Sequence, residues 1–274
     1  MKTTLLLLTL CGTLLVEGSP SPQNTDTSLA ARELWERVLQ AKGGRDQLNR
    51  IDNLLVTGFS PRDLEHPTGV DLFIFPNKRW LWSDNGETVL GTSLWVTDET
   101  GTWEAYYHPR NRIPRGTAWG PPNDLLKYRV LELHTDFLLE TKWLKPVPLR
   151  VRVGRIGREE FDVVSVDYGT AMRGSSQYEY YVDKKTFLVR RIVWRNVTTD
   201  FQDYRPIEGI MMPSRVTYVG KPTVSYSPEF AFNVAYDPEI FKRKPSLDDG
   251  PNGWKLRPAE PQLLPGRVPK SRER

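Results

Sequence analysis

Short runs of alternating apolar and polar residues, each ended by turn-forming residues, constrain the fold of this chain more than any other feature. Between residues 53 and 108 such runs follow one another, and Pro, Gly, Asn or Asp bounds each of them. A period of two places successive side chains on opposite faces of a strand. The pattern predicts antiparallel strands in a meander, with the sequences LLVTGF, VDLFIF, RWLWS, TVLG, SLWVTD and TWEAYY.

The alternation also assigns faces within this meander. Val70, Leu72 and Ile74 share one face of their strand, with Asp71 on the other. Trp80 and Trp82 likewise share a face of the next strand. These apolar faces are the first candidates for a core or for a ligand-binding surface.

A second group of strands is predicted after residue 148, and two tight turns lie within it. The strand sequences are LRVRVGRI, EFDVVSVDY, QYEYYV, FLVRRIVW, DYRPIEGIMMPSRVTYV and a last run over 229–234. In the turn 183–186, Asp183 can accept backbone N–H groups and Thr186 can close the loop. In the turn 206–209, Pro206 presets the backbone and Gly209 can adopt positive φ.

Two helices interrupt the strands. Ser28 is predicted to cap a helix that ends at Gly43-Gly44, and residues 45–50 add a further helical turn. After a Pro-, Gly- and Arg-rich stretch over 110–122, a second helix is predicted from Asp124. It carries an apolar stripe wide enough to be covered on much of its circumference.

The N-terminus is typical of an export signal. Lys2 precedes an apolar stretch from Leu5 to Val16, which is short for a membrane span, and we expect cleavage after Gly18. A retained N-terminal anchor is the alternative. Cys11, the only cysteine, lies inside this stretch without a lipoprotein signal, so the mature chain has no thiol for disulfides or catalysis.

The rest of the chain is expected to be one domain followed by a tail. We divide it into a signal peptide (1–18), a polar lead-in (19–27), a β domain (28–243) and a basic, Pro-rich, disordered tail (244–274). The formal net charge is +4, and nine Lys or Arg against four Asp or Glu lie from residue 242 onwards, so the body is nearly neutral. This distribution argues against a nucleic-acid partner.

The sequence contains no recognisable catalytic or metal-binding constellation. His66, His108 and His134 lie in separate segments, without the spacing of metal ligands. Nucleophile elbows, phosphate-binding loops and zinc-protease motifs are absent from the sequence, and adjacent acids such as Glu159-Glu160 are typical of solvated loops. We therefore expect neither a cofactor, nor a metal, nor a catalytic activity.

The nine tryptophans are the positive signal. For any one of them, packing in the core is the simpler explanation. The functional alternative is a dry apolar cavity, lined by these rings, in a curved sheet that two helices cannot fill.

Four strings resemble the LolA-like family, the outer-membrane lipoprotein-sorting proteins and their relatives, which are exported carriers of acyl chains. They are QAKGGRDQL, YYVDKKTFLVRR, DYRPIEGIMMPSRV and FNVAYDPEIF, and the resemblance spans residues 28–242. The tail after Phe241 is longer than the family pattern. The resemblance implies an α+β fold in which a single curved antiparallel sheet of about ten or eleven strands forms an incomplete barrel around two helices.

On this basis we expect a periplasmic, monomeric binder or carrier of a lipid or acylated lipoprotein, with an envelope membrane protein as a partner. An envelope sensor or scaffold module is the first alternative, and an unrecognised hydrolase the second. The expected ligand-binding residues are Leu72, Ile74, Trp80, Trp82, Trp95, Tyr178, Tyr180, Ile192 and Trp194 from the sheet, and Leu126, Val130 and Phe137 from the second helix.

The leader generates the first testable prediction. Export should give a mature N-terminus between Val16 and Pro22, because the apolar stretch ends there. Intact mass of the protein from the envelope fraction measures this directly. An N-terminus at Met1, or a diacylglyceryl adduct on Cys11, would contradict it.

Overall fold

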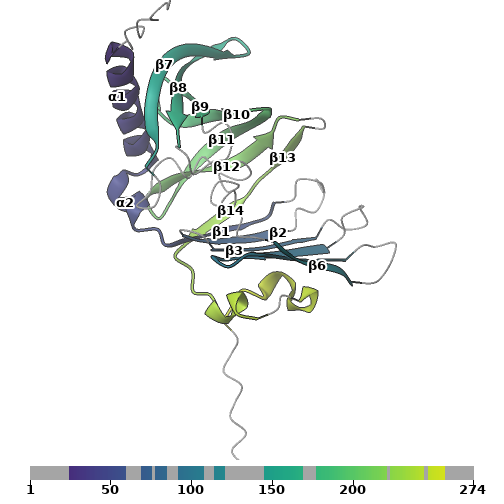
Figure 1. The fold of residues 1–274 in the computed structure, drawn as a ribbon. Coiled ribbons are helices and arrows are strands. Elements are labelled where there is room, and N and C mark those ends of the chain that lie inside the picture. The colour runs from purple at the N-terminus through teal and green to yellow at the C-terminus, as the bar shows by residue number, and fades with distance from the viewer. Residues whose placement is uncertain are drawn as a thin grey trace, which may run out of the picture.

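The computed structural model describes residues 25–59, 69–75, 78–84, 92–107, 114–120, 145–168, 177–220, 223–243 and 246–256. These segments are mostly antiparallel sheet with few helices, which confirms the expected α+β class (Figure 1). The helices are α1 (Thr25–Lys42), α2 (Arg45–Asn49) and the 3₁₀ helices η2 (Pro238–Phe241) and η3 (Leu247–Asn252).

The strands divide into two seven-stranded antiparallel sheets. The first sheet has the order β14-β1-β2-β3-β4-β5-β6, and the second runs from β13 to β7 in consecutive order. Strands of the first sheet are β1 (Asn53–Thr57), β2 (Gly69–Ile74), β3 (Lys78–Asp84), β4 (Thr92–Thr97), β5 (Thr102–Tyr107), β6 (Pro114–Gly120) and β14 (Glu229–Phe232). Strands of the second are β7 (Val147–Ile156), β8 (Glu159–Asp167), β9 (Gln177–Val182), β10 (Val189–Trp194), β11 (Val197–Ile207), β12 (Ile210–Tyr218) and β13 (Val224–Tyr226).

Two sheets replace the single sheet of ten or eleven strands that we expected. The chain changes sheets at Ser227-Pro228: β13 pairs with β12, whereas β14 pairs with β1. Proline has no N–H group and cannot continue a ladder, so the strand breaks here. Neither strand order returns to its first member, so both sheets are open over the described residues.

Helix α1 covers the second sheet. Its buried side chains recur at helical spacing, and Trp35 packs edge-on against Tyr180 with ring centroids 5.2 Å apart. The helix begins at Thr25, three residues before the expected cap, and ends as predicted before Gly43 and Gly44, which both have positive φ. A Cβ atom on Gly43 would lie 2.7 Å from the carbonyl oxygen of Gly209, so this helix end fits the β11–β12 turn only with glycine.

The first sheet carries a buried ion pair on one face. Asp71 on β2 accepts hydrogen bonds from Nε and Nη2 of Arg79 on β3, at 2.8 and 2.5 Å, and both side chains are buried. Burial raises the pKa of Asp71, and the guanidinium of Arg79 opposes this shift. The Phe73 ring stacks on the guanidinium, with its centroid 4.8 Å from Cζ of Arg79.

The C-terminal segment differs from the disordered tail that we expected from residue 244. Within it, residues 246–256 include η3 and the buried Trp254, which is 8% exposed. A capping box at Ser246 and Asp249 starts the 3₁₀ helix. We call residues 234–243 and 246–256 the C-terminal cover; in Figure 1 it lies on the side of the first sheet that faces away from the second.

Other departures from the sequence prediction concern edges and turns. β6 forms within the Pro- and Gly-rich stretch over 110–122, for which we predicted no strand; as an edge strand it tolerates these residues. The expected strand TVLG and the second helix from Asp124 lie outside the described residues. In the β11–β12 hairpin, Ile207 pairs with Ile210, so Glu208 and Gly209, both with positive φ, make the turn and Pro206 belongs to the strand.

The buried ion pair predicts a pH-dependent stability defect. Arg79→Met leaves the Asp71 carboxylate buried without its guanidinium, which should lower the free energy of unfolding by about 3 kcal/mol at pH 7. The pKa of Asp71 in the folded variant then lies above its ordinary value of 3.8, so the loss should disappear as the pH falls below that value. Urea titrations at pH 7 and at a pH below 3.8 measure this loss of stability.

The matched control is Arg155→Met, which removes an exposed ion pair with Glu160. Solvent screens such a pair, so the urea midpoint should stay unchanged at both pH values. A loss for Arg79→Met that persists unchanged in acid would show that packing, and not the charge of Asp71, causes it.

Candidate functional site

The first sheet presents a continuous apolar surface on the face opposite the Asp71–Arg79 pair. Cross-strand neighbours align on it: Leu72 lies beside Trp80, and Val70 beside Trp82. Strand β4 continues both rows. We call this surface the aromatic face; its members are the buried Leu72, Trp80, Trp82, Leu94 and Val96 and the partly buried Leu55, Val70, Ile74 and Trp103.

The C-terminal cover lies on the aromatic face. Ile240 and Trp254 are its buried members in this cluster, and Tyr236, Phe241 and Leu247 pack beside them. The cover also has polar contacts of its own: Asp237 N–H donates to the Trp254 carbonyl at 2.9 Å, and Arg243 Nη2 donates to the Gly253 carbonyl at 3.1 Å. It therefore holds its shape through internal hydrogen bonds and meets the sheet through apolar side chains.

Trp82 brings a polar group into this apolar contact. Its side chain is buried, and the indole Nε1 has no hydrogen-bond partner among the described residues. Trp35 has the same feature in the cluster beneath α1. A buried donor without an acceptor costs about 1 to 3 kcal/mol, so the Trp82 indole is a place where an acceptor would stabilise the protein.

The structure brings together only some of the residues that we predicted to bind ligand. Leu72, Ile74, Trp80 and Trp82 meet on the aromatic face, with the shared orientations that the alternation indicated. Trp95 pairs with Leu81 and lies on the opposite face of the same sheet.

The remaining predicted residues lie elsewhere. Tyr178, Tyr180, Ile192 and Trp194 belong to the other hydrophobic cluster, in which Trp35 of α1 packs against Tyr180. Tyr178 stacks on Trp194 with ring centroids 5.6 Å apart. Leu126, Val130 and Phe137 lie outside the described residues, as do the three histidines.

Sequence reasoning missed several members of the site. Leu94 and Val96 alternate with Trp95, so strand periodicity alone could have placed them, but the large ring of Trp95 drew the prediction to the wrong face. Trp254 stands in a Pro-rich segment without periodicity. Its only signal is that a large aromatic residue there needs a surface to cover it.

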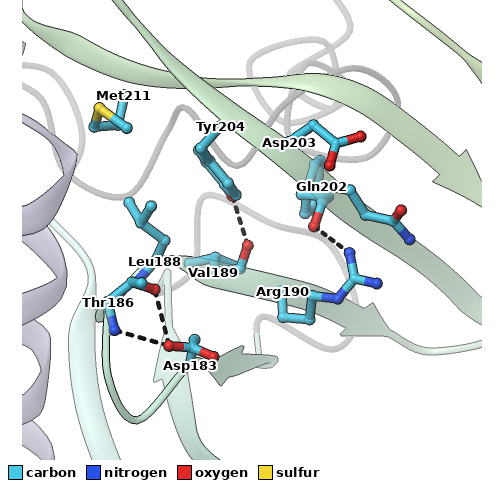
Figure 2. Close-up of a pocket in the computed structure, with 10 residues that line it drawn as sticks. Asp183, Thr186, Leu188, Val189, Arg190, Gln202, Asp203, Tyr204 and Met211 are labelled. Atoms are coloured by element: carbon cyan, nitrogen blue, oxygen red, sulfur yellow. Dashed lines mark hydrogen bonds between the residues drawn. The ribbon is translucent and has the colours of Figure 1, made fainter.

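A separate pocket of about 520 Å³ lies beside the Asp183 turn, lined by ten residues of which nine are labelled in Figure 2. Its polar groups bind one another: Tyr204 Oη donates to the Val189 carbonyl at 2.5 Å, and Arg190 Nη1 donates to the Phe201 carbonyl at 2.7 Å. In the orientation that places its side-chain oxygen toward Arg190, Gln202 accepts hydrogen bonds from the same guanidinium. These contacts make the pocket a seam between β10 and the β11–β12 hairpin.

The turn beside this pocket has the predicted chemistry. Asp183 Oδ1 accepts from the backbone N–H groups of Lys185 and Thr186, at 2.9 and 2.8 Å, and from the Thr186 hydroxyl. Burial acts to raise the pKa of Asp183, but these hydrogen bonds together outweigh it and hold the pKa below its ordinary value. The carboxylate therefore stabilises the hairpin in its charged form.

Two further properties bear on what the chain can do. Among the described residues no group of three or more His, Cys, Asp or Glu side chains could hold a metal ion. Over the same part of the chain, no helix combines the length and the hydropathy that crossing a bilayer requires.

Comparison with known proteins finds likenesses only among solved structures; no family model and no curated protein matches the chain. A DUF1329 family protein from Desulfovibrio piger matches with a TM-score of 0.42 and 11% identity, over 77% of this chain and 96% of that one. A putative outer membrane lipoprotein-sorting protein domain from Vibrio parahaemolyticus matches with a TM-score of 0.39 and 8% identity, over 77% of this chain and 97% of that one.

A LolA superfamily protein from Nitrosomonas europaea matches with a TM-score of 0.32 and 13% identity, over 79% of this chain and 98% of that one. The last two descriptions name the kind of protein that the four sequence strings resemble. All three TM-scores lie below 0.5, so these likenesses carry no argument about function.

The Asp183 turn predicts a second pH-dependent effect. Asp183→Ala should lower the free energy of unfolding by about 1 kcal/mol at pH 7, a modest value because solvent screens this half-exposed group. The folded pKa is depressed, so this contribution is present above pH 3.8 and is lost as the pH falls through the folded pKa. Denaturant titrations at pH 7 and pH 3 measure the difference.

Proposed function

We propose that this protein is an exported, non-catalytic binder or carrier of a hydrophobic ligand, a lipid or a lipoprotein acyl chain, in the periplasm. The aromatic face supports this most strongly. A row of Trp, Leu and Val side chains spans three strands of the first sheet, and in the described part of the chain two short 3₁₀ helices cover it. Its margin stays partly exposed at Leu55, Val70, Ile74 and Trp103.

The energies favour a long apolar ligand on such a surface. An acyl chain of roughly 16 carbons gains about 12 kcal/mol gross when it is buried, before ordering costs. The two buried anchors of the cover, Ile240 and Trp254, contribute roughly 2 to 3 kcal/mol each on the same scale. An acyl chain can therefore compete with the cover for the aromatic face.

This proposal narrows the ligand-binding residues to those that share a surface. Leu72, Ile74, Trp80 and Trp82 stay in the proposed site, joined by Trp103. Tyr178, Tyr180, Ile192 and Trp194 belong to the cluster that includes the buried face of α1, and we assign them to the core. The partners that follow are a lipid or acylated lipoprotein and an envelope membrane protein that delivers or receives it.

A pair of charge substitutions on opposite faces of the first sheet tests the proposal. Ile74→Lys should weaken binding of a fluorescent fatty acid at least ten-fold, because the charge lies at the margin of the aromatic face. Leu81→Lys is the matched control, since Leu81 is also partly buried but packs on the other face. Fluorescence titration of the purified variants gives both affinities.

Any one of three results would contradict the proposal. The first is that the wild-type protein binds no fatty acid, and the second is that both substitutions weaken binding equally. The third is that native mass spectrometry and lipid extraction of the purified protein recover no lipid. Thermal unfolding of both variants should first establish that they fold. Trp82→Glu is a poor probe here, because a charge on this buried ring should unfold the first sheet.

A further inference from the structure

We infer that the C-terminal cover is a built-in occupant of the ligand site, which an acyl chain displaces from the aromatic face. This inference rests on the proposed function and extends it to regulation of the same surface. The starting observation is that Trp254 and Ile240, from the last part of the described chain, are buried against Trp80, Trp82 and their neighbours.

The contacts of the cover fit an element that moves as a unit. Arg243 joins its two halves: the guanidinium donates to the Gly253 carbonyl and lies 3.4 Å from the Asp249 carboxylate. The Asp237 N–H bond to the Trp254 carbonyl closes the same loop. Val234, at its start, is tied to the sheet by two hydrogen bonds with the side chain of Asn53, at 2.9 and 3.1 Å. This tie can serve as the fixed end about which the rest departs.

The Trp82 indole indicates the chemistry of the ligand. Its buried Nε1–H finds no acceptor among the described residues while the cover is in place. A ligand that combines an apolar chain with a carbonyl or carboxylate oxygen would supply that acceptor and bury the same rings. The site is therefore suited to a fatty acyl group bearing its ester or acid oxygen, in preference to a plain hydrocarbon.

Loosening the cover tests the inference. Trp254→Ala removes the main apolar anchor of the cover. Arg243→Ala removes the contacts of the guanidinium with Gly253 and Asp249 and leaves the aromatic face unchanged. Both should strengthen binding of hexadecanoate about five-fold or more. The matched controls are Leu256→Ala, at a side chain 58% exposed, and Lys242→Ala, whose ammonium pairs with Glu239 within η2. Both controls should bind as the wild type does.

Hydrogen exchange gives a second readout on the unmodified protein. Saturation with hexadecanoate should speed exchange of backbone amides within residues 246–256, whereas a cover that closes over ligand would slow it. Trp82→Phe should weaken binding of hexadecanoate more than binding of the hydrocarbon dye diphenylhexatriene. An equal effect on the two probes would overturn the role assigned to the indole.

The outcomes separate the two proposals. If the wild-type protein and every variant fail to bind hexadecanoate, the proposed function itself fails. If the wild type binds but Trp254→Ala and Arg243→Ala leave affinity and exchange unchanged, or weaken binding, the cover is ordinary core or part of the binding wall. In that case the displacement is wrong while the function stands.

Discussion

The pairing of β14 with β1 is the contact on which the rest of the structure depends. It joins residues about 180 positions apart, and two asparagines secure it. Asn233 Oδ1 accepts from Asp52 N–H at 2.8 Å, and its Nδ2 donates to the Arg50 carbonyl at 3.1 Å; Asn53 makes the reciprocal pair of bonds to Val234. These bonds hold β14, the strand that follows β13 of the second sheet, on the edge of the first sheet. The residues after Asn233, which form the C-terminal cover, therefore lie on the aromatic face.

The four strings that resemble LolA-like proteins form two groups of contacts in the structure. The helix end at Gly43 contacts Gly209, Lys42 Nζ lies 5.3 Å from the Tyr204 ring, and Tyr204 in turn donates to Val189, so three strings form one group. The fourth string forms the asparagine hydrogen bonds with the residues that follow the first. The residues that make these contacts therefore specify how the sheets and α1 are assembled, whereas the end of the fourth string, from Tyr236 to Phe241, lies on the aromatic face as part of the C-terminal cover.

Strand positions and faces could be predicted because alternation is a local property. The runs containing Leu72 and Trp82 were assigned to the correct strands and to a common face for this reason. The division into two sheets could not be predicted in this way, since it depends on which partner each side of Pro228 finds. The turn at Glu208-Gly209 was misplaced by one residue because Pro206 is itself a strong turn signal. In the structure Pro206 instead pairs with Met211 as part of strand β11.

The candidate site shows the same limit more sharply. Periodicity states that Trp80 and Trp82 point the same way, but it does not state what lies in front of them. Tyr178 and Tyr180 have an equally regular pattern, yet both are fully buried in the cluster in which Trp35 of α1 packs against Tyr180. The difference between a core and a ligand surface is the nature of the covering element. A helix with five buried apolar residues is a lasting partner, whereas a cover of two short 3₁₀ helices, with Ile240 and Trp254 as its buried anchors, is a partner that a longer apolar chain can replace.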